Sequence, residues 1–176
     1  LSSMFTALVV WLMLRWEEEA DEPHAARWII LIAYLMGLSI GVHLLNLLTI
    51  PALVFIYYFR KYKSITLKGL VLVTLLACAI LLVLNGIIIP YTVYFGAMVD
   101  VFCVNSLGLP VNTGIVLFAF ALFGALGAAI YYTHRNGKRL LNLAAVCVTM
   151  IMLGFSSYVS VTIRAAVNPP MNSNNP

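Results

Sequence analysis

Residues 69–89 read GLVLVTLLACAILLVLNGIII and carry no charged side chain. A helix needs about 20 apolar residues to cross the hydrocarbon core of a bilayer, so this stretch predicts a transmembrane helix. The whole chain has a similar composition: 63% of its 176 residues are hydrophobic and 9% are charged, whereas about 25% of the residues of an ordinary soluble domain are charged. The sequence therefore predicts an integral membrane protein.

Further apolar stretches lie on both sides of this one, and together they predict an all-α fold, a polytopic transmembrane helical bundle without β-sheet. The expected spans are residues 1–14, 28–43, 46–59, 69–89, 114–133 and 140–163. They make one transmembrane domain over residues 1–164, after which the polar residues 165–176 begin an external segment. Pro90 is expected to close the span 69–89, and residues 91–105 are expected to form a partly helical segment at the outer surface.

Two stretches depart from the usual length of a span. Residues 1–14 are too short to cross a bilayer, so we expect them to end a longer helix and the chain to be an internal fragment of a larger protein. The run 28–59 is too long, since as one helix it would measure about 48 Å against a hydrocarbon core about 30 Å thick. Either a strongly tilted single helix or two short spans with a break at residues 43–51 fits, and we favour the two spans.

The chain has ten Lys and Arg residues against six Asp and Glu residues, which gives a net charge of +4. The basic residues gather in short clusters between the apolar stretches. Such clusters are topology signals rather than a nucleic-acid surface, so no nucleic-acid partner is expected. The positive-inside rule places residues 60–68 and 134–139 in the cytoplasm, and residues 91–113 and the tail after Arg164 outside. The acidic residues 17–22 lack His or Cys at ligand spacing, so we expect a solvated cytoplasmic face and no metal site.

Four segments resemble one family of membrane proteins. The longest is WIILIAYLMGLSIGVHLLNLLTIPALVFIYYFRKYK at residues 28–63, and the others are GIIIP at 86–90, VNSLGLPVNTG at 104–114 and IRAAVNPPMNSNNP at 163–176. The chain resembles a family of large polytopic membrane proteins of unknown function from Bacteroidota, which is related to protein O-mannosyltransferases of the GT-C architecture. The resemblance implies a GT-C-like helical bundle that crosses a bacterial inner membrane several times.

The resemblance also implies a reaction and its partners. GT-C enzymes take a sugar from a polyprenyl-phosphate donor on the outer face of the membrane, so the expected partners are membrane lipid, this donor and an exported protein acceptor. No cofactor is assigned. The catalytic acidic residue of GT-C enzymes lies in the first external loop, which no segment of this chain resembles. The resemblance therefore implies a fragment without its catalytic acid or base, and the catalytic residues stay unassigned.

Three polar residues are candidates for binding the donor phosphate: His43, Asn46 and Arg164. The segment GLSIGVH at 37–43 resembles the Gly-rich helix that GT-C proteins end at the outer surface, where imidazole and amide groups can donate hydrogen bonds to a phosphate. Each candidate has a structural alternative. His43 can bridge helices as a neutral imidazole, Asn46 can satisfy backbone groups freed at the helix break, and Arg164 can snorkel to the interface.

Asp100 is the only acidic residue outside residues 15–27 and is a candidate polar site at the outer face, where it can accept a hydrogen bond from a sugar hydroxyl. A solvated loop carboxylate is the alternative. The leading function is therefore the membrane-embedded part of a GT-C-like glycosyltransferase. The competing functions are a membrane transporter or channel, which broken helices and an intramembrane His also suit, and a structural subunit of an envelope complex.

Overall fold

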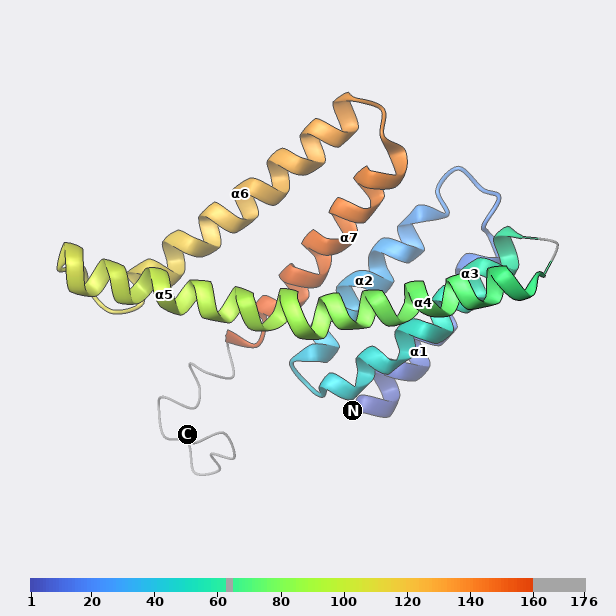
Figure 1. Ribbon diagram of the computed structural model, residues 1–176, viewed down its shortest axis with the longest axis horizontal. Helices are drawn as coiled ribbons and strands as arrows, with labels where there is room; N and C mark the ends of the chain where they lie inside the picture. Colours follow the sequence, from blue (N-terminus) through green and yellow to red (C-terminus); the bar gives the residue numbers. More distant parts are fainter. Residues whose placement is uncertain (63–64, 160–176) are drawn as a thin grey trace. The chain divides into compact units, whose positions relative to one another are not determined.

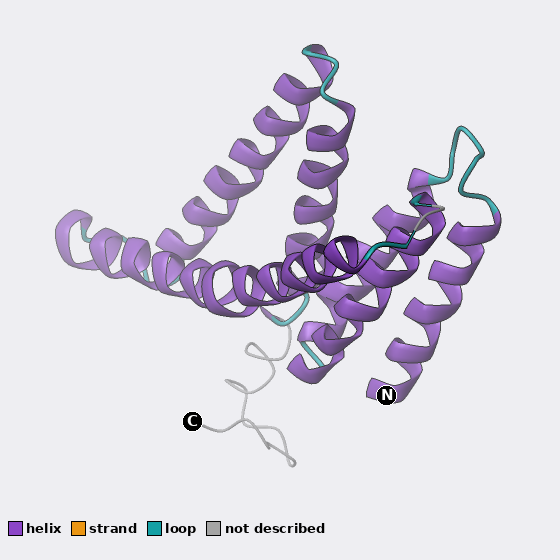
Figure 2. Ribbon diagram, turned by 45° about the vertical axis from the view of Figure 1, so that its right-hand side comes forward, coloured by secondary structure: helices purple, strands orange, loops and turns teal. Residues whose placement is uncertain are grey.

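A computed structural model describes residues 1–62 and 65–159 (Figure 1). Of the residues that the structure describes, 85% are helical, and Figure 2 shows only helices and loops in this part of the chain. The all-α prediction is therefore confirmed. The elements are α1 (Ser2–Glu18), α2 (Ala26–Ile40), η1 (Leu44–Thr49), α3 (Ile50–Lys61), α4 (Leu67–Val83), η2 (Leu84–Ile88), α5 (Ile89–Leu107), α6 (Thr113–Arg135) and α7 (Arg139–Ser156).

Four helical stretches of the described residues are long and apolar enough to cross a membrane. They are Leu44–Lys61, Leu67–Leu107, Thr113–Arg135 and Arg139–Ser156. The helix α2 is also apolar but shorter, with 15 residues. These lengths and compositions indicate a multi-pass membrane protein. The exact spans, the domain boundary at residue 164 and the identity of the membrane stay predictions.

The run 28–59 is not a single α-helix. The helix α2 ends at Ile40, three residues form a turn, and the 3-10 helix η1 then leads into α3. Pro51 lies in the first turn of α3, where its missing N–H removes no helical hydrogen bond. The helix break therefore starts after Ile40, before His43. A break caused by Pro51 alone would lie closer to Pro51 in the sequence.

The run from residue 67 to 107 differs from the prediction. Pro90 was expected to close the span 69–89, but α4, η2 and α5 form one continuous helical stretch through it. The helix therefore does not end at Pro90, and the bounds of the span stay a prediction. The π-helical turn η2 lies just before Pro90, and at its end the Ile89 N–H donates to the Leu84 carbonyl oxygen. Local π adjustments of this kind satisfy backbone groups that a proline leaves without a donor inside a membrane helix. Residues 91–105 are consequently wholly helical.

This continuous stretch is longer than a bilayer is thick. Leu67–Leu107 has 41 residues, or about 60 Å at 1.5 Å per residue, which is twice the thickness of a hydrocarbon core. A helix of this length fits a membrane only if part of it lies outside the hydrocarbon or along the interface. The predicted crossing at 69–89 with a helical segment beyond it remains one arrangement of this kind.

The described residues form two compact units, the first of which contains residues 1–49 and 146–159. Here α1 packs against α2, and both contact η1. The core of this unit is apolar and contains Val9, Leu12, Met36 and Leu47, all at most 4% exposed. Between membrane helices, side chains of this kind stabilise the unit by close van der Waals packing.

Glycines let α2 approach α7 closely within this first unit. A Cβ atom at Gly37 would clash with the backbone carbonyl oxygen of Ile151, and one at Gly154 would lie 2.5 Å from the Tyr34 carbonyl oxygen. Backbone contacts of this kind are possible only where the residue has no side chain. Gly37 lies in the segment that resembles the Gly-rich helix of GT-C proteins. In the structure it has a packing role, because it lets α2 approach α7.

The second unit contains Ile50–Ala145. It is built from two helical hairpins, in which α3 packs against α4 and α5 packs against α6 (Figure 1). Gly108 turns the chain after α5 in the left-handed conformation, with φ of 64°. Most of the apolar side chains of α4, α5 and α6 are exposed, as lipid-facing residues of a membrane helix are.

Candidate functional site

The turn between α2 and η1 presents His43 at the surface of the first unit. The Ser39 carbonyl oxygen accepts hydrogen bonds from the backbone N–H groups of Val42 at 3.0 Å and His43 at 2.9 Å. The imidazole Nδ1 of His43 then accepts the backbone N–H of Leu45 at 3.2 Å. A neutral imidazole that accepts at Nδ1 carries its proton on Nε2. The exposed side chain therefore caps η1 with one nitrogen and has an N–H donor on the other.

Asn46 lies beneath this turn and is only 4% exposed. Its Oδ1 accepts the hydroxyl of Ser2, and its Nδ2 donates to the Ser39 carbonyl oxygen at 3.5 Å. The amide thus joins the start of α1, the end of α2 and η1. The Ser39 carbonyl oxygen also accepts two backbone N–H groups, so the Asn46 amide adds a third donor there. Because its amide points inward, Asn46 positions the turn and does not share a surface with the imidazole of His43.

Ser39 is a residue of this site that the sequence did not reveal. It is 1% exposed, and its hydroxyl donates to the Met36 carbonyl oxygen at 2.8 Å. Its carbonyl oxygen collects three donors, from Val42, His43 and Asn46. A serine inside GLSIG gives no sequence signal for such a role, since small residues at a helix end are common. The third donor-site candidate, Arg164, lies outside the described residues.

Asp100 is a helical residue of α5 and not a loop residue, so the interpretation as a solvated loop carboxylate is wrong. Its Oδ1 accepts the backbone N–H of Gly114 at 2.9 Å and its Oδ2 that of Asn112 at 3.1 Å. The carboxylate therefore caps the N-terminus of α6, where the helix dipole favours a negative charge. A Cβ atom at Gly114 would clash with the backbone of Asp100, so α5 and α6 touch at this cap.

Replacing Asp100 should lower stability because two backbone donors at the start of α6 lose their acceptor. Asp100→Ala is expected to cost about 1–2 kcal/mol, and Asp100→Asn, which keeps one carbonyl oxygen, about half of that. The measurement is the melting temperature in detergent. Asn105→Ala, an exposed change on the same helix, is the control. A normal melting temperature for Asp100→Ala would show that the cap does not stabilise the hairpin.

A second polar cluster ties α1 to α2 around Glu19, in the segment expected to be a solvated acidic face. The carboxylate of Glu19 accepts hydrogen bonds from Trp28 Nε1 at 2.8 Å and Arg27 at 2.7 Å, and also pairs with Arg15 at 3.3 Å. Both guanidinium groups lie over the Trp28 ring, at 6.0 Å for Arg15 and 5.1 Å for Arg27. The hydrogen bond from Trp28, and then that from Arg27, lowers the pKa of Glu19 below its ordinary value of 4.5.

This cluster predicts loss of stability in acid. A carboxylate whose pKa is lower in the folded state stabilises the protein above the unfolded value and loses that contribution as the pH falls through the folded value. The melting temperature should therefore drop as the pH falls below the ordinary value of 4.5, and less steeply in Glu19→Gln than in the natural protein. Glu22→Gln removes an exposed carboxylate of the same loop and should keep the natural slope. Identical slopes for all three proteins would contradict the role of Glu19.

No group of three His, Cys, Asp or Glu side chains within the described ranges is arranged to hold a metal ion. At the turn, His43 Nε2 offers hydrogen-bond donation from an exposed side chain, and the buried Asn46 and Ser39 hold the turn from below. Such a donor suits an anionic oxygen, as of a phosphate.

Among known protein families, one is similar to the part of the chain that contains this turn. No curated protein and no solved structure matches the chain. Residues 1–66 of the 176 match a family model, which is described as the protein O-mannosyl-transferase TMEM260 N-terminal domain. The matched residues include α1, α2, η1 and α3, and with them Glu19 and His43. Through residues 1–66, the chain is similar to this O-mannosyl-transferase N-terminal domain.

Proposed function

We propose that the chain is the membrane-embedded part of a protein O-mannosyltransferase-like glycosyltransferase, which takes a sugar from a polyprenyl-phosphate donor and transfers it to exported protein. The match of residues 1–66 to the O-mannosyltransferase family model carries this proposal. The multi-pass helical architecture supports it, because an enzyme that uses a lipid-linked sugar has to reach its substrate at the bilayer.

In this proposal His43 binds the donor phosphate. Its Nε2–H is the free donor of the exposed imidazole, since Nδ1 accepts the Leu45 N–H. In the transfer reaction, the acceptor hydroxyl oxygen forms a bond to the anomeric carbon of the sugar while the bond from that carbon to the phosphate oxygen breaks. Negative charge grows on the departing phosphate, so a hydrogen bond from His43 stabilises the transition state more than the bound donor.

The turn that contains His43 does not supply the general base of the reaction in this proposal. Residues 23–99 contain no Asp or Glu, so the carboxylate that removes the proton of the acceptor hydroxyl comes from another part of the protein. Asp100 is a weak candidate, because both of its oxygens accept backbone N–H groups of α6. The contribution proposed for this chain is therefore donor binding.

Deletion of the gene tests the proposed function in cells. Exported proteins from the deletion strain should lose O-linked hexose, measured by mass spectrometry of their peptides, and the full-length gene should restore it. Unchanged hexose in the deletion strain would contradict the proposal. Loss of a solute uptake activity, with all glycans retained, would instead favour a transporter.

A further inference from the structure

Three basic residues lie at one end of the hairpin formed by α3 and α4. Arg60 and Lys61 lie in the last turn of α3, and Lys68 lies in the first turn of α4. The two helices pack side by side (Figure 1), and a Cβ atom at Gly69 would clash with the hydroxyl of Tyr58. This contact holds the end of α3 against the start of α4, so we call Arg60, Lys61 and Lys68 the basic end of the hairpin.

The unit that contains the basic end offers it little negative charge. Asp100 is the only acidic residue between 50 and 145, and its two carboxylate oxygens accept the backbone N–H groups of Asn112 and Gly114. Lys61 and Lys68 are exposed, and no ion pair involves either of them among the described residues. Their charges therefore attract an anion from outside the chain.

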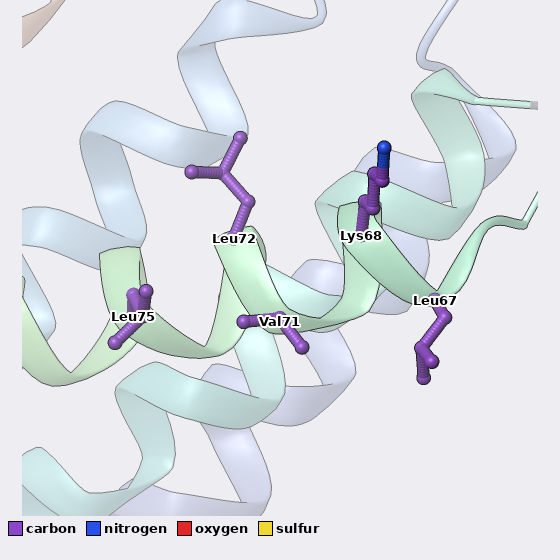
Figure 3. Close-up of a pocket in the computed structure, with 5 residues that line it drawn as sticks. All are labelled: Leu67, Lys68, Val71, Leu72 and Leu75. Atoms are coloured by element: carbon purple, nitrogen blue, oxygen red, sulfur yellow. The ribbon is translucent and has the colours of Figure 1, made fainter.

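A shallow, open apolar groove begins at Lys68 on the surface of α4. The side chains that line it are Leu67, Lys68, Val71, Leu72 and Leu75, all on α4. In Figure 3, Lys68 and Leu72 project to the same side of the helix and Leu67 to the opposite side. The four apolar residues are more than half exposed, with Leu72 at 69%. The groove thus combines a cation at one end with an apolar path along the helix.

We propose that the basic end and this groove bind an anionic phospholipid, with the phosphate at Lys68 and Lys61 and an acyl chain along Val71, Leu72 and Leu75. A phospholipid has a charged headgroup and an apolar chain. The protein offers a cation for the first and an apolar surface for the second, and this complementarity carries the proposal. Tyr58 and Tyr62, whose rings lie 5.2 Å apart at the end of α3, suit the headgroup region of a membrane. The proposed lipid is distinct from the sugar donor at His43 and does not depend on the proposed function.

Lipid binding can be measured on the full-length protein by native mass spectrometry from a neutral detergent. Phosphatidylglycerol should bind more tightly than phosphatidylcholine. Lys61→Gln and Lys68→Gln should each weaken phosphatidylglycerol binding about fivefold. Leu72→Ala, at a highly exposed position where folding should be retained, should weaken it as well by shortening the apolar path. Lys138→Gln is the matched control, because it removes one positive charge from a different loop, where Lys138 lies over Tyr132 at 6.0 Å.

The other sources of binding give different results in the same experiment. Glycerol phosphate that competes as strongly as phosphatidylglycerol would show a site for free phosphate compounds and overturn the proposal. An equal loss of binding in Lys138→Gln would show that only the net charge matters, and this would overturn the proposal. Equal affinity for phosphatidylglycerol and phosphatidylcholine would show that no anion is needed, which would overturn it as well. A dimer that disappears in Leu72→Ala would show that a second copy covers the groove, and this would overturn it too.

Discussion

Gly37→Ala should destabilise the protein strongly, because the new methyl group would clash with the backbone carbonyl of Ile151. A backbone cannot move aside as a flexible side chain can, so α2 and α7 have to separate. We expect a cost of about 3 kcal/mol or more, which is a large part of the 5–15 kcal/mol that stabilises a typical domain. The measurements are the melting temperature and the monodisperse fraction in detergent.

Gly124→Ala and Gly127→Ala are the matched controls for this prediction. Both glycines lie in α6, and a Cβ atom at either position would have no atom within 4 Å beyond its chain neighbours and the nearby backbone of its own helix. Alanine is a better helix former than glycine by about 1 kcal/mol, so these variants should be as stable as the natural protein or slightly more stable. A Gly37→Ala protein that melts like these two controls would contradict the close approach of α2 and α7.

His43→Ala should lower sugar transfer by about 10–150-fold. This range corresponds to the loss of one charge-assisted hydrogen bond, about 1.5–3 kcal/mol. The measurement is transfer per molecule of folded protein, made on the full-length protein so that a change in abundance is not counted as a change in activity. Retention of full transfer by His43→Ala would end the assignment of His43 to the donor.

Two further substitutions separate the roles of the two imidazole nitrogens. The amide of asparagine takes the position of Nδ1, so His43→Asn can still accept the Leu45 N–H but has no donor at the position of Nε2. The amide of glutamine reaches that position instead. If the Nε2–H binds phosphate, His43→Gln should retain more transfer than His43→Asn, and His43→Lys should retain some. Equal transfer by the Asn and natural proteins would assign His43 to the cap alone.

The sequence predicts the helical membrane architecture well, because composition and apolar runs report directly on the surrounding solvent. It does not predict the helix through Pro90, since the π-helical turn η2 that accommodates the proline depends on local backbone geometry. The interruption of the run 28–59 was predicted from its length, and the structure shows it at residues 41–43.

The candidate site was predictable only in part. His43 stands out because an ionisable group in an apolar run is uncommon, and the structure places it at an exposed turn. The burial of Asn46 and the capping role of Asp100 depend on partners 44 and 14 residues away, which spacing alone does not identify. The Glu19 cluster was missed for the same reason, since a run of acidic residues is usually a solvated face.

The most direct test of the proposed function is sugar transfer by the purified full-length protein. The protein is reconstituted in vesicles with a radiolabelled polyprenyl-phosphate mannose and a peptide from an exported protein that carries O-linked hexose. The account predicts label on the peptide that increases with time and falls about 10–150-fold in His43→Ala. The absence of labelled peptide with the natural protein, or labelling from a nucleotide sugar but not from the lipid-linked donor, would contradict it.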